Sequence, residues 1–153
     1  MYRKVVVGGT FNRLHKGHKG ILGAAFEIGR SVVIGLTSDE FASRFRVLKT
    51  KPYSTRKGQL KEYIEINGNG KPYTILKIDD SYGIATIDPK IDCIVVSEET
   101  LLRAEEINAI RFKKGLSRLS ILVIPIVLAE DRKPISGERI SCGEIDVDGR
   151  VLE

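Results

Sequence analysis

The sequence predicts an α/β protein built on a doubly wound, five-stranded parallel sheet. Five apolar, strand-like runs occur along the chain, and helical periodicity falls between several of them. The runs are rich in Val and Ile without alternating polar residues, which is typical of a sheet covered by helices on both faces. A length of 153 residues with 42% hydrophobic residues suits one core, and we predict a single domain over residues 1–153.

The predicted strands are each bounded by turn or helix signals. They are Val5–Val7, Val32–Leu36, Tyr73–Ile78, Ile91–Val96 and Leu119–Ile124. The turn-rich stretch over residues 67–72 is predicted to be a loop and not a domain boundary.

The helices are predicted from apolar spacing and from serines that suit an N-cap. The first helical pattern runs through Ile21 to Ile28, directly after the first strand and its turn. Later helices are expected to start at Ser38, Ser54 and Ser97, and the last of them to stop near Gly115.

The stretch GGTFNRLHKGH, residues 8–18, joins the first strand to the first helix and predicts a phosphate-handling site. Its glycine pair lets the backbone approach a bulky anion. The helix that follows supplies N–H groups and the positive end of its dipole. His15 and His18 are three residues apart, so they share one face of the first turn and can reach one phosphate together with the hydroxyl of Thr10.

Other site types fit this stretch less well. A Walker A loop and a dinucleotide fingerprint both need glycine spacings that are absent here. Zinc is disfavoured because H-E-x-x-H is missing and Cys93 and Cys142 lie far apart, so we predict no metal held by protein ligands. Two ordinary surface histidines at a helix start are a further alternative, which leaves the glycines and Thr10 unexplained.

Three loops are expected to share one crevice. In open α/β sheets, ligands bind beyond the carboxyl ends of the strands, where the strand order reverses. Residues 8–18, residues 35–39 and residues 97–100 each follow a predicted strand, so all three should face that crevice.

Charge and composition narrow the class of partner. The net charge of +5 suits nucleic acid, but equally a site for a triphosphate and a second phosphorylated substrate. The densest basic group, residues 44–57, has only two aromatic residues, so we expect no nucleic-acid partner. The chain shows no signal peptide, no membrane-length apolar run and no disulfide framework, and we expect a cytoplasmic protein.

The motif at residues 8–18 resembles the signature of the HxGH nucleotidyltransferases, in particular the archaeal and eukaryotic type of phosphopantetheine adenylyltransferase. Further similar segments are residues 37–40, 80–83, 95–100 with Ile107, Asn108 and Arg111, 135–140 and 143–146. The resemblance runs from Met1 to about Val151. It implies a Rossmann-like nucleotidyltransferase fold and transfer of an adenylyl group from ATP to 4′-phosphopantetheine, giving dephospho-coenzyme A and pyrophosphate in coenzyme A biosynthesis.

The resemblance also implies residue roles. Thr10 and His18 would contact the reacting phosphate, and His15 would bind the nucleotide's phosphates. The remaining nucleotide contacts implied are Gly8, Gly9, Phe11, Gly17, Ser97, Arg111, Ser136 and Arg139. Lys49 or Lys51 would hold the phosphate of phosphopantetheine with Thr37 nearby, and Mg²⁺ would accompany ATP. Ser97 and Arg111 could instead be a helix cap and a plain surface arginine.

Two departures and two alternatives remain. Asn12 stands where the family usually has Asp, so an acid–base or metal role there is not expected. The family's I-S-S-T-R-I-R reads ISGERIS over residues 135–141, which removes two hydroxyls and adds Glu138 beside a triphosphate. A cytidylyltransferase or FMN adenylyltransferase is the first alternative function, although its R-T-x-G-I-S-T segment is missing. A non-catalytic nucleotide- or RNA-binding relative is the second.

Overall fold

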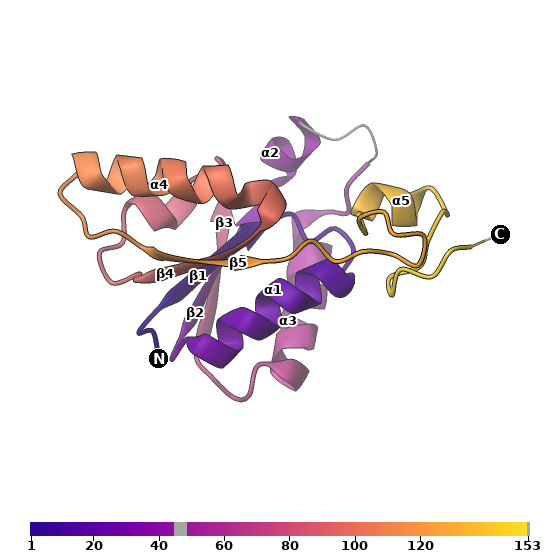
Figure 1. Cartoon of the computed structure of the whole chain (residues 1–153), viewed down its shortest axis with the longest axis horizontal. Helices are drawn as coiled ribbons and strands as arrows, with labels where there is room; N and C mark the ends of the chain where they lie inside the picture. Colours follow the sequence, from indigo (N-terminus) through magenta and orange to yellow (C-terminus); the bar gives the residue numbers. More distant parts are fainter. Residues whose placement is uncertain (45–48, 153) are drawn as a thin grey trace.

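A computed structural model describes residues 1–44 and 49–152, so residues 45–48 of the basic group lie outside the described part. One sheet contains β1 (Val5–Gly9), β2 (Val32–Thr37), β3 (Tyr73–Ile78), β4 (Cys93–Ser97) and β5 (Ser120–Ile124). Every strand pair is parallel and the order is β3-β2-β1-β4-β5 (Figure 1). The predicted five-stranded parallel sheet is therefore confirmed, with strand ends shifted by at most two residues.

The helical elements are α1 (Lys16–Ile28), α2 (Asp39–Arg44), α3 (Tyr53–Asn67), η1 (Gly83–Thr86), η2 (Glu98–Thr100), α4 (Leu101–Lys113) and α5 (Gly137–Ser141). Ser38 precedes α2 and its hydroxyl accepts the N–H of Phe41 at 3.2 Å, as predicted. Ser97 caps η2, the short turn that leads into α4. Ser54 was wrong as a cap, because α3 already begins at Tyr53 directly after Pro52.

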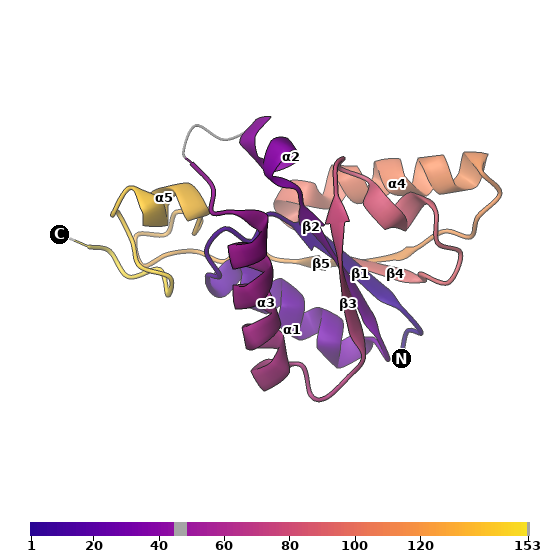
Figure 2. The same cartoon turned by 180° about the vertical axis from the view of Figure 1, so that it is seen from behind.

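Helices cover both faces of the sheet. Alternate residues of β1 point to opposite sides, so Val5 and Val7 belong to one core cluster and Val6 to another. The first cluster contains residues of α1 and α3, among them Leu60, and the second contains residues of α4 and η1, among them Ile107. Figures 1 and 2 show the same division, with α1 and α3 on one side of the sheet and α4 on the other. This arrangement explains why the strands carry apolar residues without polar alternation.

The order of the strands reverses between β1 and β4. From β1 the chain builds outward to β2 and β3, then returns to the other side of β1 for β4 and β5. The β1–β4 pairing covers only Val5–Cys93 and Val6–Ile94, whereas β1 pairs with β2 along its whole length. The carboxyl ends of β1 and β4 are thus unpaired with each other, at the place where ligands bind in such sheets.

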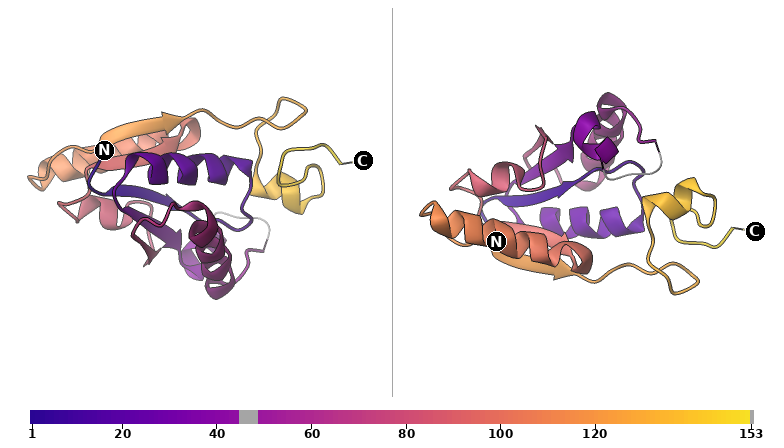
Figure 3. Two further views of the ribbon diagram at one scale, coloured as in Figure 1. Left: turned by 90° about the horizontal axis from the view of Figure 1, so that it is seen from below. Right: turned by 90° about the horizontal axis from the view of Figure 1, so that it is seen from above.

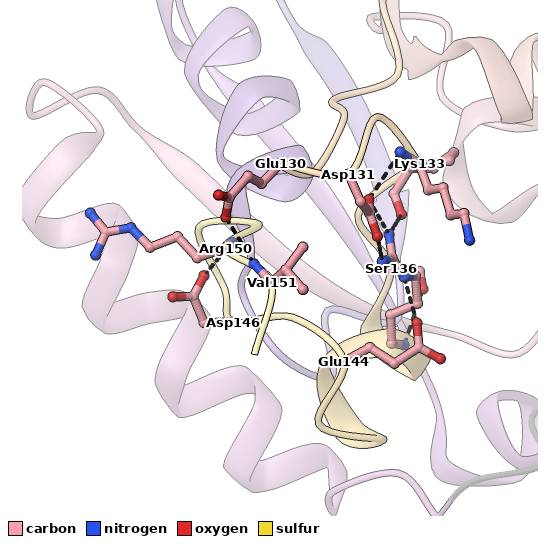
Figure 4. A network of polar contacts seen from close by, with 10 residues as sticks. Glu130, Asp131, Lys133, Ser136, Glu144, Asp146, Arg150 and Val151 are labelled. Carbon is pink, nitrogen blue, oxygen red and sulfur yellow. Dashed lines mark hydrogen bonds and ion pairs between the residues drawn. The ribbon is translucent and has the colours of Figure 1, made fainter. Parts of the chain in front are cut away.

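The segment after β5 lies beyond the carboxyl ends of the strands, next to the start of α1 (Figure 3). It has a small core of its own, made of Ala129, Ile135 and Ile145. Side-chain carboxylates close its turns, as Figure 4 shows for Glu130, which accepts the N–H of Val151 at 3.1 Å. The N–H of Lys16, the first residue of α1, donates to the carbonyl of Val147 at 3.0 Å and ties the segment to the start of that helix.

Among the residues that the structure describes, no helix is both long and apolar enough to cross a membrane.

Candidate active site

A cavity of about 570 Å³ opens at the carboxyl ends of β1 and β4. Its walls come from the turn after β1, the start of α1, the end of β4, the start of α4, residues 124–127 and the beginning of α5. It brings together these predicted site residues: Gly8, Gly9, Thr10, Phe11, His15, Gly17, His18, Thr37, Ser97 and Ser136. The three loops expected to share a crevice do so, and the volume suits a small-molecule site.

The turn between β1 and α1 owes its shape to Phe11. Its φ is +47°, in the left-handed region that costs a non-glycine residue roughly 1–2 kcal/mol. The Phe11 ring is buried and lies 4.9 Å from the His18 ring, centroid to centroid. A Cβ at Gly9 would come within 3.1 Å of the Phe11 ring, a tight contact that the absent side chain of glycine avoids. Backbone strain of this kind is concentrated at functional sites.

His15 is the N-cap of α1. Its Nδ1 accepts the N–H of Gly17 at 3.1 Å and that of His18 at 3.4 Å, so in the neutral ring the proton is on Nε2. The ring is buried and stacks on the His18 ring with centroids 3.7 Å apart. A Cβ at Gly17 would lie 2.9 Å from Cε1 of His15, which explains the glycine between the histidines. His15 therefore stabilises the helix start as well as lining the cavity.

His18 has two neighbours that compete for its Nδ1. The carbonyl oxygen of Arg13 lies 3.0 Å away and requires a proton on Nδ1, while the N–H of His15 at 3.4 Å requires a lone pair. Which of the two bonds forms depends on the tautomer of the ring. If Nδ1 accepts from His15, the neutral ring carries its proton on Nε2 and can donate it to a phosphate; if Nδ1 donates to Arg13, Nε2 donates only from the imidazolium cation.

The hydroxyl of Thr10 is oriented by Thr37. Thr37 Oγ1 donates to Thr10 Oγ1 at 3.0 Å, and itself accepts a hydrogen bond from Arg56 Nη1 at 3.3 Å. Because Thr37 donates its hydroxyl proton to the oxygen of Thr10, Thr10 is the acceptor in that bond and its own hydroxyl proton can point toward a ligand. Thr37, predicted to lie beside phosphopantetheine, is placed to orient Thr10.

Arg56 of α3 was not predicted as a site residue. Its guanidinium is fully buried and donates to the carbonyls of Thr10 and Lys51, at 3.0 and 2.8 Å. It also pairs with Asp39 at 2.9 Å. Helical spacing could have predicted that Arg56 is buried. It precedes the buried Leu60 of α3 by four residues and so lies on the same inward face of the helix.

Neither of the two candidate lysines lines the cavity. Asn12 Oδ1 accepts the N–H of Lys51 at 2.7 Å and holds this stretch beside the turn. The Lys51 ammonium lies 3.5 Å from Gln59 Oε1, and Lys49 is exposed. Asn12 thus orients the backbone of Lys51 with its amide oxygen.

The prediction that Arg111 binds phosphate is wrong. Its guanidinium is buried at the amino end of β4, on the far edge of the sheet from the cavity. It donates to the carbonyls of Ala85, Asp88, Ile91 and Ser117 at 2.7–3.3 Å. Burial lowers the pKa of this guanidinium, and nearby Asp88 opposes that shift. Arg111 ties α4 to the loop that precedes β4.

The side chain of Arg139, a predicted phosphate ligand, does not line the cavity in this structure. The guanidinium pairs with Asp131 and with Glu144, the latter at 2.8 Å, and donates to the carbonyl of Pro134 at 3.0 Å. These partners hold it away from the cavity wall, and the ion pair with Asp131 raises the Arg139 pKa. Ser136 does line the cavity, but its hydroxyl accepts the N–H of Arg139 at 3.2 Å and caps α5. Figure 4 shows Ser136 beside Asp131 and Glu144 in this network.

Further polar side chains line the cavity that the sequence did not single out. Glu99 of η2 and Arg103 of α4 both line it. Asp80, after β3, also lines the cavity, and its Oδ1 accepts the N–H of Gly83 at 2.6 Å. Glu138, already expected from the sequence to lie beside the triphosphate, also lines the cavity, from α5.

Comparison with known proteins agrees with this geometry. A family model described as cytidylyltransferase-like matches residues 6–142. A phosphopantetheine adenylyltransferase from Methanothermobacter thermautotrophicus is 44% identical over 152 residues, which is 99% of this chain and 91% of that protein. A bifunctional phosphopantetheine adenylyltransferase/NTP phosphatase from Thermoplasma volcanium is 48% identical over 97% of this chain, but the chain spans only 44% of its length. The crystal structure of a protein of unknown function from Archaeoglobus fulgidus superposes with a TM-score of 0.71 at 33% identity, covering 87% of this chain and 99% of that one.

Proposed function

Because the chain belongs to the cytidylyltransferase-like family and, within it, to the phosphopantetheine adenylyltransferases, we propose that it is a nucleotidyltransferase of coenzyme A biosynthesis. It transfers the adenylyl group of ATP to 4′-phosphopantetheine and forms dephospho-coenzyme A and pyrophosphate. The observation that carries the proposal is the cavity wall made by Thr10, His15 and His18, on a turn strained into shape at the reversal point of the sheet.

The reaction requires positioning and charge neutralisation more than acid–base chemistry. An oxygen of the acceptor's phosphate bonds to the α-phosphorus of ATP, and the bond from that phosphorus to the β-phosphate oxygen breaks. The acceptor is already largely dianionic near neutral pH, since the second pKa of a phosphate monoester is about 6, so no general base is needed. The protein has to align the two phosphates and stabilise charge on the oxygens around the reacting phosphorus.

Three side chains of the turn would divide this work. Thr10, with its hydroxyl proton directed by Thr37, would donate to the reacting phosphate. His18, which also lines the cavity, would donate from Nε2 to the same group in the transition state. His15, whose Nδ1 caps α1, would donate from Nε2 to the nucleotide's phosphates in the ground state.

Magnesium would enter with ATP. Among the described residues, no group of three or more His, Cys, Asp or Glu side chains could hold a metal ion. Mg²⁺ would therefore be bound mainly by the triphosphate and by its own water molecules. When bound, the ion would neutralise negative charge on the triphosphate.

We place the reaction in the cytoplasm, with no nucleic acid as partner. Cys93 and Cys142 are both free thiols in the structure, which fits a reducing compartment. The positive net charge of +5 is then used to attract two phosphorylated small molecules.

An assay of pyrophosphate release tests the proposal. ATP and CTP are each offered with Mg²⁺ and with phosphopantetheine, FMN or a phosphorylated alcohol as acceptor, and the product is identified by mass. We expect phosphopantetheine to be adenylylated and ATP to be preferred over CTP by at least roughly tenfold, which needs only about 1.4 kcal/mol of discrimination. Reactions without acceptor measure simple hydrolysis. Equal turnover of CTP, turnover with FMN alone, or nucleotide binding without transfer would each assign the chain to a different function.

A further inference from the structure

We propose that Arg56 is a positioning residue that sets where Thr10 lies relative to Lys51, and so aligns the nucleotide's phosphate with the acceptor's. This inference rests on the proposed function. It assigns the alignment of the two substrates to a buried arginine that contacts neither of them.

The guanidinium of Arg56 joins loops that belong to different strands. Nη1 donates to the carbonyl of Thr10, in the turn after β1, and to the hydroxyl of Thr37, at the end of β2. Nε donates to the carbonyl of Lys51, just before α3. Nη2 pairs with Asp39 at the start of α2. One rigid planar group thus contacts four segments at the carboxyl end of the sheet.

Arg56 is itself held firmly. Its side chain has no exposed surface, and its own N–H donates to the carbonyl of Pro52 at 3.0 Å. Leu60 and Ile64, on the same face of α3, are buried in the core cluster that contains β1 and β2. The core therefore holds the guanidinium in place, and its hydrogen bonds hold the loops that carry Thr10 and Lys51.

The peptide of Lys51 is held on both sides. Its N–H donates to Asn12 Oδ1 at 2.7 Å, and its carbonyl accepts from Arg56 Nε at 2.8 Å. Asn12 belongs to the turn that carries Thr10, so the turn and the lysine stretch are linked twice, through Asn12 directly and through Arg56. A shift in either link changes the separation of the two groups that would hold the two phosphates.

A lysine at this position could not replace the arginine. Arg presents five N–H donors in a fixed plane, whereas Lys carries a single ammonium group with three. Arg56→Lys would keep the charge next to Asp39 and lose the simultaneous contacts to Thr10 and Lys51. That makes it a test of geometry with the charge held constant.

Arg111 supplies a matched control. It is also an arginine on a helix, it is equally buried, and its guanidinium also bridges backbone carbonyls. It lies at the opposite edge of the sheet from the cavity, where its loss should affect stability and leave alignment intact.

The experiment compares wild type, Arg56→Lys and Arg111→Lys at a temperature below the unfolding of all three. Steady-state kinetics are measured for both substrates, and amide hydrogen exchange is followed for peptides covering residues 8–14, 49–56 and 85–91. Misplacing reacting groups by about 1 Å can cost on the order of a hundredfold in rate. We expect Arg56→Lys to lower kcat by roughly 10- to 100-fold, with ATP affinity by calorimetry changed less than about threefold.

The exchange data separate alignment from general loosening. Arg56→Lys should accelerate exchange in residues 8–14 and 49–56 together, and Arg111→Lys in residues 85–91 with kcat near that of wild type. Wild-type kcat in Arg56→Lys, or an equal loss of kcat in both variants, would overturn the positioning role. If the wild-type protein transfers no adenylyl group, the proposed function fails. Hydrogen exchange then still tests the role of Arg56: unaltered exchange in residues 8–14 or in residues 49–56 of Arg56→Lys would show that Arg56 does not link these two segments.

Discussion

Two segments line the same cavity and carry the same family resemblance, yet they hold their side chains in different ways. In residues 8–18 the functional side chains face the cavity, and the bonds behind them come from the sheet and α3. In residues 135–141 the one arginine turns away into ion pairs and the one capping hydroxyl is used by its own helix. The first segment therefore presents its polar side chains to the cavity, whereas the polar groups of Ser136 and Arg139 in the second segment bond within the C-terminal region.

The difference follows from what each segment is packed against. The turn after β1 rests on buried strands and on the core cluster that includes Phe11 and Leu22. The C-terminal segment has a core of only Ala129, Ile135 and Ile145, and its turns depend on exposed carboxylates (Figure 4). We call residues 8–18 the first wall of the cavity and residues 135–141, with the C-terminal segment that holds them, the second wall. Because exposed charges are screened by salt and neutralised by acid, we expect the stability of the second wall to depend far more on salt and pH than that of the first.

The largest expected effect is a loss of kcat when a residue of the first wall, His18, is replaced. His18→Ala should lower kcat by roughly 10²–10³-fold with little change in ATP affinity, because a transition-state donor acts mainly on the chemical step. Steady-state kinetics and ATP calorimetry measure the two quantities. Near-normal kcat would remove the distinction between the segments, and loss of the fold on treatment with a zinc chelator would mean that the histidines are metal ligands.

A smaller effect is expected at the lysine stretch. If Lys49 or Lys51 holds the acceptor's phosphate, replacing that lysine by Ala should cost about ten- to a hundredfold in phosphopantetheine use, since a hydrogen bond to a charged group contributes roughly 1.5–3 kcal/mol. ATP affinity should stay nearly intact, which calorimetry checks. Wild-type behaviour of both single variants and of the double variant would make the stretch an ordinary solvated face.

Replacing His15, also in the first wall, is expected to change the stability of the fold as well as ATP binding. Because its ring is buried and caps α1, His15→Ala should lower the free energy of unfolding by about 0.5–2 kcal/mol, as loss of an N-cap does, and should also weaken ATP binding. His15→Asn is the matched variant, because asparagine is a good N-cap and should restore stability without restoring ATP affinity. Urea unfolding and calorimetry separate the two effects, and equal stability of all three proteins would contradict the capping role.

The smallest effect concerns pH and the second wall. The hydrogen bond from Arg139 holds the pKa of Asp131 below its ordinary value. A carboxyl with a lowered folded-state pKa contributes stability above its unfolded pKa of about 3.9 and loses it as pH falls through the folded value. Hydrogen exchange of residues 131–144 in wild type and Asp131→Asn should therefore differ at pH 5–8 and converge below about pH 4. A difference that persists at low pH would place the stabilisation elsewhere.

The sequence by itself determined the sheet and the first wall of the site. Strands rich in Val and Ile without polar alternation predict a sheet that is buried on both faces. A glycine pair followed by two histidines three residues apart predicts a turn and a helix start, because both depend on contacts between residues close in sequence. His15 Nδ1, for example, bonds to N–H groups two and three residues ahead, well within reach of local patterning.

Only the tertiary structure decided what the arginines do. Arg56 and Arg111 both lie on the inward faces of helices, and helical spacing can say that a side chain points inward. It cannot say which end of the sheet that side chain meets, because this depends on how far each helix runs back along the strands. Arg56 therefore bonds to Thr10, 46 residues away, beside the cavity, while Arg111 bonds to Ala85, 26 residues away, at the opposite edge. Those partners are set by the packing of whole elements, which no local pattern encodes.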